Sequence, residues 1–525
     1  MASTDYVIGI DCSTTATKAV VWDLNGAPIA DGRATFPLST PQPGWHEQDA
    51  EDWWRATRTA LREAAAKVDT SRIKAIGLTH QRESFVCVNA DGRPLRAAIL
   101  WLDARSADEV ARYGSEHIHQ ITGKPPDPTP ALYKLYWLRN HEPGLLERTA
   151  KVVDVHAFLV HCFTGHWRTS WACADPLGLI DMQRFDWSDE ILRDLGLTRE
   201  QMCDLVPPGA VVGGLKPDVA QELGLRADLP IVAGAGDGQT AGLGANITEP
   251  GKAYLNLGTA VVSGAYSDHY AWGREFRTLA GPIPRTYTLE TLLRGGTYTI
   301  SWFVDQFSGV RAADLNLGLG TEQILEAAAA QVAPGAEGLL LLPYWNTCAT
   351  PYWDAQACGT IFGWRGHHGK AHMYRALLEG LAFEQRLGTD GMEKGVGRPI
   401  ERLLAMGGGS RSPLFCQIMA DIVNRPVTVC REAEATCLGA GMFGAAGVGA
   451  FRDLREAATA MSGEGATFQP DPKRAAFYDR LYTDVYKELY PRLAPLFPAL
   501  ANALRVREEI SAAGMDEERS MPISP

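Results

Sequence analysis

The chain carries one short pattern twice, about half a chain apart. In residues 6–23, a β-rich apolar run reaches Asp11, a small polar turn follows, and a second apolar run returns. Residues 252–264 repeat this order, with Gly258-Thr259 in the turn. Such a turn can present amides and hydroxyls to an anion. The repeat indicates a duplicated chain whose two hairpins hold a phosphate chain from both sides, and an unrelated second hairpin is the alternative that the pattern leaves open.

A further apolar run, residues 230–232, leads into glycines that surround one carboxylate, Asp237. Glycine leaves space and permits unusual backbone angles, so a ligand can closely approach an Asp that lies between Gly236 and Gly238. An Asx turn that closes a strand would use the same residues. Because the other motifs of the chain accompany it, we interpret Asp237 as a general base.

Length and charge limit the kinds of protein that this chain can be. At 525 residues it exceeds one ordinary hydrophobic core, so two or more domains are expected. The net charge of -12 disfavours nucleic acid as a partner, because phosphate backbones attract basic surfaces. The sequence shows neither an apolar stretch of membrane-spanning length nor the blocks of a signal peptide. We therefore expect a cytoplasmic protein without a membrane partner.

Polar residues gather where the predicted strand at residues 73–78 ends. Open α/β sheets place their ligands at the carboxyl ends of strands. Charged and amide groups at such an edge suit a substrate with many hydroxyls. An internal salt bridge between Arg82 and Glu83 is the alternative interpretation of that pair. The residues that follow this strand and a later apolar run are Gln81, Arg82, Glu83, Trp101 and Asp103.

A second glycine-rich loop lies near the carboxyl end of the chain. Residues 403–406 form an apolar run that leads into three glycines and a Ser-x-Ser-Pro segment, where a helix begins. Free amides at a helix N-terminus can bind a nucleotide, although a glycine triplet can also be a plain turn. Small apolar residues at 436–447 predict a helix that packs closely, and the charged residues 505–525 predict a mobile tail.

With these motifs in this order, the sequence resembles the FGGY family of carbohydrate kinases over about residues 6–450. The resemblance implies the family's α/β fold, a duplicated actin-like ATPase with two ribonuclease H-like domains and a cleft between them. The implied divisions are 1–248 as a sugar-binding domain, 249–450 as an ATP-binding domain, 451–504 as a helical extension and 505–525 as a disordered tail. The motifs that carry it are Asp11-Cys12-Ser13-Thr14-Thr15 with Lys18, Gly44-Trp45-His46-Glu47-Gln48-Asp49, Gln81-Arg82-Glu83, Trp101-Leu102-Asp103, Asp237, Leu257-Gly258-Thr259, Pro351-Tyr352-Trp353-Asp354 and Met406-Gly407-Gly408-Gly409-Ser410-Arg411-Ser412-Pro413.

By this resemblance, Asp237 matches the catalytic base, which takes the proton from a sugar primary hydroxyl as that hydroxyl attacks the γ-phosphorus of ATP. Asp11 matches the carboxylate that holds hydrated Mg²⁺. This chemistry asks the protein for alignment, charge neutralisation and one base. The predicted substrate-binding residues are Gln81, Arg82, Glu83, Trp101, Asp103, Asp237 and Gly238. The predicted ATP-binding residues are Ser13, Thr14, Thr15, Lys18, Gly258, Thr259, Gly296, Gly408, Gly409, Ser410 and Ser412.

The sequence departs from the family pattern in two respects. Ser13 stands where the first phosphate loop usually has glycine. The substrate motifs are also mixed, because residues 81–83 look like the glycerol kinase version while xylulokinases commonly have Met-His-Gly there. The glycerol kinase pattern expects an aromatic residue five positions before Lys134, where this chain has Thr129. Residues 128–132 look closer to xylulokinase-like members.

Three hypotheses follow for the activity. The first is an ATP-dependent kinase, with Mg²⁺, that phosphorylates a terminal hydroxyl of a pentulose, with D-xylulose to D-xylulose 5-phosphate as the leading reaction. The second keeps the chemistry and uses glycerol or erythritol. The third is a non-catalytic nucleotide-binding regulator, which the presence of both Asp11 and Asp237 disfavours. The expected partners are a small sugar or polyol and ATP, and a homodimer is possible because members of the family are often dimers.

Overall fold

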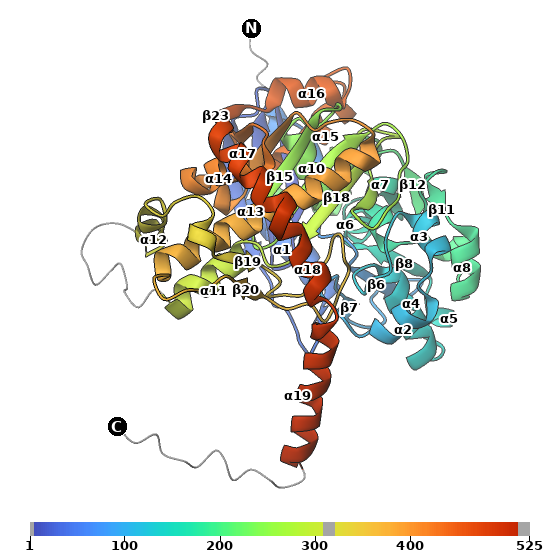
Figure 1. Cartoon of the computed structure of the whole chain (residues 1–525). Coiled ribbons are helices and arrows are strands. Elements are labelled where there is room, and N and C mark those ends of the chain that lie inside the picture. Colours follow the sequence, from blue (N-terminus) through green and yellow to red (C-terminus); the bar gives the residue numbers. More distant parts are fainter. Residues whose placement is uncertain (1–4, 308–320, 513–525) are drawn as a thin grey trace, which may run out of the picture.

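The computed structural model describes residues 5–307 and 321–512, which form two large sheets with helices packed around them (Figure 1). The first sheet has the order β13-β14-β5-β1-β2-β3, and the second has the order β17-β18-β16-β15-β21-β22-β23. The strands of the first are β1 (Tyr6–Cys12), β2 (Ala16–Asp23), β3 (Pro28–Thr35), β5 (Ile73–His80), β13 (Val211–Gly214) and β14 (Pro230–Gly236). Those of the second are β15 (Lys252–Leu257), β16 (Val261–Ser267), β17 (Arg277–Ala280), β18 (Tyr287–Leu293), β21 (Arg402–Met406), β22 (Val427–Cys430) and β23 (Glu464–Phe468).

The two sheets repeat the same pairing. In the first, β1 pairs antiparallel with β2 and parallel with β5, which pairs parallel with β14. In the second, β15 pairs antiparallel with β16 and parallel with β21, which pairs parallel with β22. Both sheets also carry an antiparallel edge strand beyond the parallel part, β13 in one and β23 in the other. The internal duplication predicted from the two hairpins is therefore confirmed.

Two helices of small residues connect the halves. Helix α10 (Asp237–Gly244) follows β14, and α15 (Ala435–Gly447) follows β22; the two pack on each other, and α15 lies against β1 and β5 of the first sheet. The backbone of α15 lies so close to β1 and β5 that only glycine fits at the points of contact. A Cβ on Gly9 would lie 1.9 Å from the Cys437 carbonyl oxygen, and one on Gly77 would lie 1.8 Å from that of Ala440. The predicted close packing of the helix at 436–447 is confirmed.

An insertion between β5 and β13 carries the predicted acceptor residues 81–103, on the right of Figure 1. Three of its strands form a small sheet with β4, which precedes β5 in the chain, in the order β4-β7-β6-β8. The β17–β18 edge of the second sheet reaches this insertion: the Thr278 N–H donates to the Gly123 carbonyl at 2.8 Å, and the Ala280 N–H donates to the Asp175 carboxylate at 2.8 Å. The strands are β4 (Glu47–Gln48), β6 (Phe85–Val88), β7 (Ala98–Ile99) and β8 (Lys151–Asp154), and the helices of the first half include α1 (Ala50–Ala65), α2 (Ala107–Tyr113), α3 (Glu116–Thr122), α4 (Ala131–His141), α5 (Leu145–Arg148), α6 (Val155–Thr164), α7 (Trp171–Ala174), α8 (Asp189–Leu195) and α9 (Pro217–Leu223).

The carboxyl-terminal part differs from its prediction at two points. The segment expected to be a helical extension also supplies β23, an exposed edge strand whose residues lack the apolar alternation that would have indicated it. Helix α19 (Leu496–Ala512) continues through residues 505–512, which were expected to belong to the tail, and extends away from the body (Figure 1). Residues 513–525 lie outside the described part. The helices here are α11 (Thr297–Phe307), α12 (Thr321–Ala329), α13 (Lys370–Val396), α14 (Pro413–Val423), α16 (Leu454–Met461), α17 (Pro472–Leu481) and α18 (Lys487–Leu493).

Among the described residues, no helix combines the length and the apolar character that crossing a membrane requires.

The contact between α15 and the first sheet predicts that Gly77→Ala destabilises the protein. The new methyl group would meet the Ala440 carbonyl at 1.8 Å, and a backbone atom inside a helix cannot turn aside. Such overpacking costs about 1–3 kcal/mol, so the thermal midpoint should fall. Gly366→Ala is the control, because nothing lies within 4 Å of the position that its methyl group would take. Equal thermal midpoints for the two variants would contradict this account of the packing.

Candidate active site

The predicted first phosphate loop, residues 13–15, joins β1 to β2. The Ser13 N–H and hydroxyl both donate to the Ala16 carbonyl, at 2.9 and 2.8 Å. The serine that replaces the usual glycine therefore closes the turn. The Thr14 hydroxyl accepts from Trp101 Nε1 at 2.9 Å, and its carbonyl accepts from Gln48. These bonds join the phosphate loop to the predicted acceptor residues, and the neighbouring Thr15 is exposed.

Asp11 lies at the end of β1 with one carboxylate oxygen buried and without a hydrogen-bond partner among the described residues. Burial, together with the charges of Asp237 and Glu434, raises the pKa of its carboxyl to about 7, although the charge of Lys18 opposes the rise. A buried carboxylate oxygen without a partner suits a cation, and Mg²⁺ commonly binds through one or two carboxylates while it keeps several waters. The residues present therefore fit the hydrated Mg²⁺ that the resemblance implies.

Lys18, predicted to bind ATP, is paired in this structure. Its ammonium lies 2.6 Å from the carboxylate of Glu434, the residue before α15. The pair joins the first phosphate loop to the second half of the chain.

The predicted glycine segments of the second half lie together. The Thr297 N–H donates to the Gly258 carbonyl at 2.9 Å, and the Tyr298 N–H donates to the Thr259 carbonyl at 3.2 Å, so the β15–β16 turn meets the start of α11. A Cβ on Gly296 would lie 2.6 Å from the Ala260 carbonyl carbon.

The triple-glycine loop after β21 meets the same turn. A Cβ on Gly409 would lie 2.9 Å from Leu257 Cβ, whereas Gly408 has open space around it. The Ser410 hydroxyl donates to the Gly407 carbonyl at 2.7 Å, and the Ser412 hydroxyl accepts from the Phe415 N–H at 3.0 Å, which caps α14. Both serines shape the loop, and their contact with a nucleotide stays a prediction.

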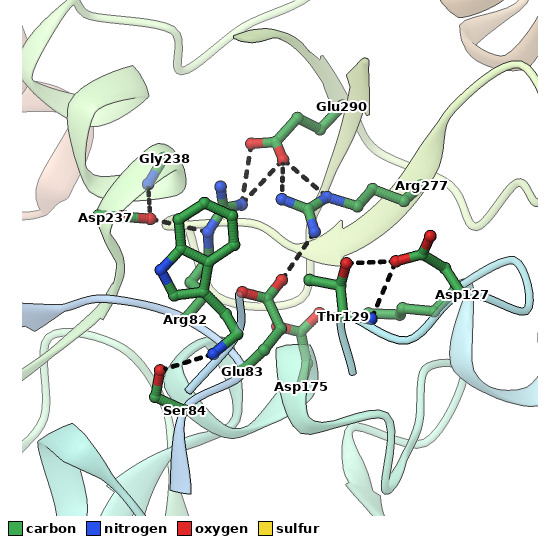
Figure 2. Close-up of polar contacts among 12 residues, drawn as sticks. Arg82, Glu83, Ser84, Asp127, Thr129, Asp175, Asp237, Gly238, Arg277 and Glu290 are labelled. Atoms are coloured by element: carbon green, nitrogen blue, oxygen red, sulfur yellow. Dashed lines mark hydrogen bonds and ion pairs between the residues drawn. The ribbon is translucent and has the colours of Figure 1, made fainter. Parts of the chain in front are cut away.

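A buried cluster of charges lies beside Asp237 (Figure 2). Asp237 begins α10, and one carboxylate oxygen, Oδ1, accepts from Arg82 Nε and from the Gly238 N–H, both at 2.7 Å. Arg82 Nη1 also donates to both oxygens of Glu290 at 2.9 Å. Arg277 donates to Glu290 and, through Nη1, to Glu83 at 2.7 Å.

This pairing differs from the alternative interpretation, in which Arg82 and Glu83 pair with each other. Arg82 binds Asp237 and Glu290 while Glu83 binds Arg277, and a contact of either residue with substrate stays a prediction. Burial raises the pKa of the Glu83 carboxyl, and Arg277 and Arg82 oppose the rise. Arg82 and Glu83 are thus both connected to the β17–β18 edge of the second sheet.

Arg277 and Glu290 were not predicted from the sequence. A signal was present, since Glu290 interrupts β18, a strand whose seven residues are all buried. An ionisable residue in such a strand requires a buried partner of opposite charge. Its partners come from 208 and 13 positions away, which no local pattern shows.

Gln81 and Asp103 use their polar groups on the protein itself. The Asp103 carboxylate is buried and accepts from the His46 N–H at 2.6 Å and from Arg105 through its N–H, Nε and Nη2. The Gln81 amide binds Gln48 and Ser84. In this structure both side chains order the loops around the acceptor region, and a direct contact with substrate stays a prediction.

Lys134 joins two segments at the edge of this region. Its buried Nζ donates to the Thr129 carbonyl at 2.7 Å and to the Trp101 carbonyl at 3.4 Å, and burial lowers its pKa to about 8. Thr129 in turn bonds to Asp127, whose carboxylate lies 2.8 Å from Arg294 at the end of β18. A polar, interdomain contact therefore occupies the place where the glycerol kinase pattern expects an aromatic residue.

Comparison with known proteins identifies the family. The description "FGGY family of carbohydrate kinases, N-terminal domain" matches residues 6–244, and the corresponding C-terminal domain matches residues 253–448. The chain belongs to the FGGY family of carbohydrate kinases. It is accordingly an ATP-dependent sugar kinase with the two-domain fold of that family, which confirms the fold class and the enzyme class predicted from the sequence.

Its relatives act on different substrates. The xylulose kinase of Bacillus subtilis (strain 168) is 30% identical over 94% of this chain and 98% of the relative. The gluconokinase of the same strain is 27% identical over 95% and 96%, and the glycerol kinase of Thermococcus gammatolerans is 33% identical over 86% and 91%. The structure of ligand-bound xylulose kinase from Lactobacillus acidophilus matches with a TM-score of 0.88 at 27% identity, over 94% of this chain and all of that chain.

The raised pKa of Asp11 predicts a pH-dependent cost in stability. Its pKa is about 7 in the folded chain against an ordinary value of 3.8, so ionising it costs the folded state free energy above pH 7. This cost disappears as the pH falls towards 4, where both states bind the proton. We expect Asp11→Asn to raise the thermal midpoint of the Mg²⁺-free protein at pH 8, with a gain that shrinks steadily between pH 7 and pH 4.

The control for this measurement is Asp31→Asn, at an exposed position of β3. It should leave the midpoint nearly unchanged across the same range. A gain for Asp11→Asn that does not depend on pH would contradict the assignment of the cost to this carboxylate.

Proposed function

We propose that the enzyme transfers the γ-phosphate of ATP to a terminal hydroxyl of a neutral pentulose, with D-xylulose to D-xylulose 5-phosphate as the leading reaction. The observation that carries the proposal is the position of Asp237, at the start of α10 beside Asp11 and next to the acceptor residues Arg82 and Glu83. Xylulose kinases among the relatives, aligned along nearly the whole chain, support the choice of acceptor.

Asp237 is oriented for the role of general base. Arg82 and the Gly238 N–H both bind Oδ1, which leaves Oδ2 for the acceptor hydroxyl. In the proposed step, Oδ2 takes the proton as the hydroxyl oxygen attacks the γ-phosphorus and ADP leaves. Mg²⁺ held through Asp11 would neutralise charge on the phosphates. The first loop and the three glycine segments of the second half would hold the phosphates and adenosine.

The charges of the acceptor region favour a neutral substrate. Arg82 and Arg277 are shared among Asp237, Glu83 and Glu290, so this cluster of two cations and three anions carries a net charge of about -1. Two neighbouring cations are also paired with carboxylates, Arg294 with Asp127 and Lys124 with Asp175, and the buried Lys134 donates to backbone carbonyls. A substrate carboxylate would find no free guanidinium among these residues, and burying it unpaired would be costly.

A glycerol or erythritol kinase is the second candidate. The motif at residues 81–83 and the glycerol kinase relative favour it. Thr129 disfavours it, because a small polar residue bonded to Asp127 replaces the aromatic side chain that the glycerol kinase pattern expects. A non-catalytic regulator is the third, and the combination of Asp11 and Asp237 disfavours it.

The acceptor is tested by ADP release with Mg-ATP across D-xylulose, L-xylulose, D-ribulose, L-ribulose, glycerol and erythritol, run beside Asp237→Asn. We expect turnover with one or more ketopentoses, and a loss of about 10²- to 10⁴-fold in the variant because it keeps the shape and removes the base. Turnover on glycerol or erythritol alone would select the second candidate. A panel without any turnover would contradict the proposal.

A separate prediction concerns an acidic acceptor. Because each cation of the acceptor cluster has a carboxylate partner, D-gluconate should show a kcat/KM at least about 100-fold below that of the best neutral acceptor. Competition between D-gluconate and that acceptor measures binding separately from turnover. Efficient phosphorylation of D-gluconate would show that one of these ion pairs opens for the substrate.

A further inference from the structure

One carboxylate of the second half, Glu290 in β18, binds the same arginine, Arg82, as the predicted base. It is fully buried and accepts hydrogen bonds from Arg82, from Arg277 at 2.8 and 2.6 Å, and from the Tyr254 hydroxyl. Burial by itself would raise the pKa of its carboxyl, but Arg82 and Arg277 outweigh burial and lower the pKa to about 2. Glu290 is therefore ionised and carries five donated bonds from three side chains.

Arg82 connects Glu290 to the base. Its Nε lies 2.7 Å from Asp237 Oδ1, while its Nη1 lies 2.9 Å from both Glu290 oxygens. A guanidinium is planar and rigid, so fixing Nη1 at one side determines the direction in which Nε points at the other. Because Arg82 is only 8% exposed, no solvent-exposed orientation competes with this one. The orientation of Asp237 thus depends on a residue that it does not touch.

The glycines on either side of Asp237 make room for this arrangement. A Cβ on Gly238 would lie 2.7 Å from Glu290 Oε2 and 3.0 Å from Arg82 Nη2. A Cβ on Gly236 would lie 2.5 Å from Arg82 Cγ. The open space predicted for a ligand around Asp237 is used, in part, by the side chains that orient it.

We propose that Glu290 is a positioning residue for the transfer step: it holds Arg82 so that Asp237 presents its free oxygen to the acceptor hydroxyl. The proposal rests on the proposed role of Asp237 as base. Glu290 lies in the second sheet, whereas Arg82 and Asp237 follow strands of the first, so the base is correctly oriented only when the β17–β18 edge meets the acceptor residues. The orientation of Asp237 therefore depends on the contact between the two halves of the chain.

The test is Glu290→Gln, which keeps the shape and one acceptor oxygen but removes the charge that Arg82 and Arg277 share. We expect kcat for the best acceptor to fall about 10- to 100-fold, as for a slightly misplaced reacting group, while KM for Mg-ATP changes less than about 2-fold. The same substitution in an Asp237→Asn background should lower kcat by less than about 2-fold, because a residue that acts through the base has no further effect once the base is gone.

Two outcomes would overturn the proposal. One is a kcat for Glu290→Gln within about 2-fold of the wild type. The other is an equal fold-loss of kcat in the wild-type and the Asp237→Asn backgrounds, which would show that Glu290 has only a structural role. If Glu290→Gln does not fold, Tyr254→Phe removes a single bond to Glu290 and should lower kcat a few-fold in the wild-type background alone. An unchanged kcat for this variant would likewise contradict the proposal.

Glu379→Gln is the matched control. Glu379 is also buried in the second half and is bound by an arginine, Arg375, and a tyrosine hydroxyl, that of Tyr478, but it lies on α13 away from the acceptor cluster. It should leave kcat within about 2-fold of the wild type even where it lowers the thermal midpoint. If Glu379→Gln lowered kcat as much as Glu290→Gln does, the loss would be a general effect of removing a buried glutamate charge from this half of the chain, and the proposal would be contradicted.

Different measurements test the role of Glu290 and the proposed function. Wild-type turnover across the acceptor panel tests the proposed function, and the difference between the two backgrounds tests Glu290 with whichever acceptor is turned over. If no acceptor supports turnover, the crystal structure of Glu290→Gln decides: the proposal requires Arg82 Nε to leave Asp237, and an unmoved Arg82 would overturn it.

Discussion

The arrangement of this enzyme depends on the close contact of helix α15 with the first sheet. Backbone atoms of α15 approach Gly9 and Gly77 at distances that only glycine permits, and Trp22 donates to the Cys437 carbonyl of the same helix. The contact places Glu434 beside the first phosphate loop, where it pairs with Lys18 and adds negative charge near Asp11. A residue of the second half, Glu434, thus changes the charge around Lys18 and Asp11 of the first half.

A second contact between the two domains consists of ion pairs. Three ion pairs, Arg82 with Glu290, Arg277 with Glu83 and Arg294 with Asp127, connect the acceptor residues to the β17–β18 edge of the second sheet. Buried charges are costly unless they are paired, so these side chains hold one another in a single arrangement. The result is a region of paired side chains next to Asp237, the proposed base, whose hydrogen bonds from Arg82 and Gly238 both go to Oδ1. That combination favours transfer to a bound hydroxyl, since alignment supplies much of the rate in phosphoryl transfer.

Several features were predictable because they depend on short segments. The duplicated hairpins, the helix of small residues at 436–447 and the strand before Asp237 each follow from local composition. Residues 505–512, which were predicted as part of the tail, continue helix α19, because charged residues are compatible with an isolated helix as well as with disorder. The strand β23 was missed because an exposed edge strand needs no apolar alternation.

The sequence by itself determined which groups are available: the carboxylates Asp11 and Asp237, the small turns for phosphates and the Arg82-Glu83 pair, all placed by their strands at the carboxyl ends of a sheet. Only the tertiary structure decided how those groups are used. Asp103 binds Arg105, Lys18 binds Glu434, and Arg82 and Glu83 take different partners from β17 and β18. The physical reason is that a buried charge takes whichever opposite charge the fold brings within hydrogen-bond distance, and these partners are far apart along the chain.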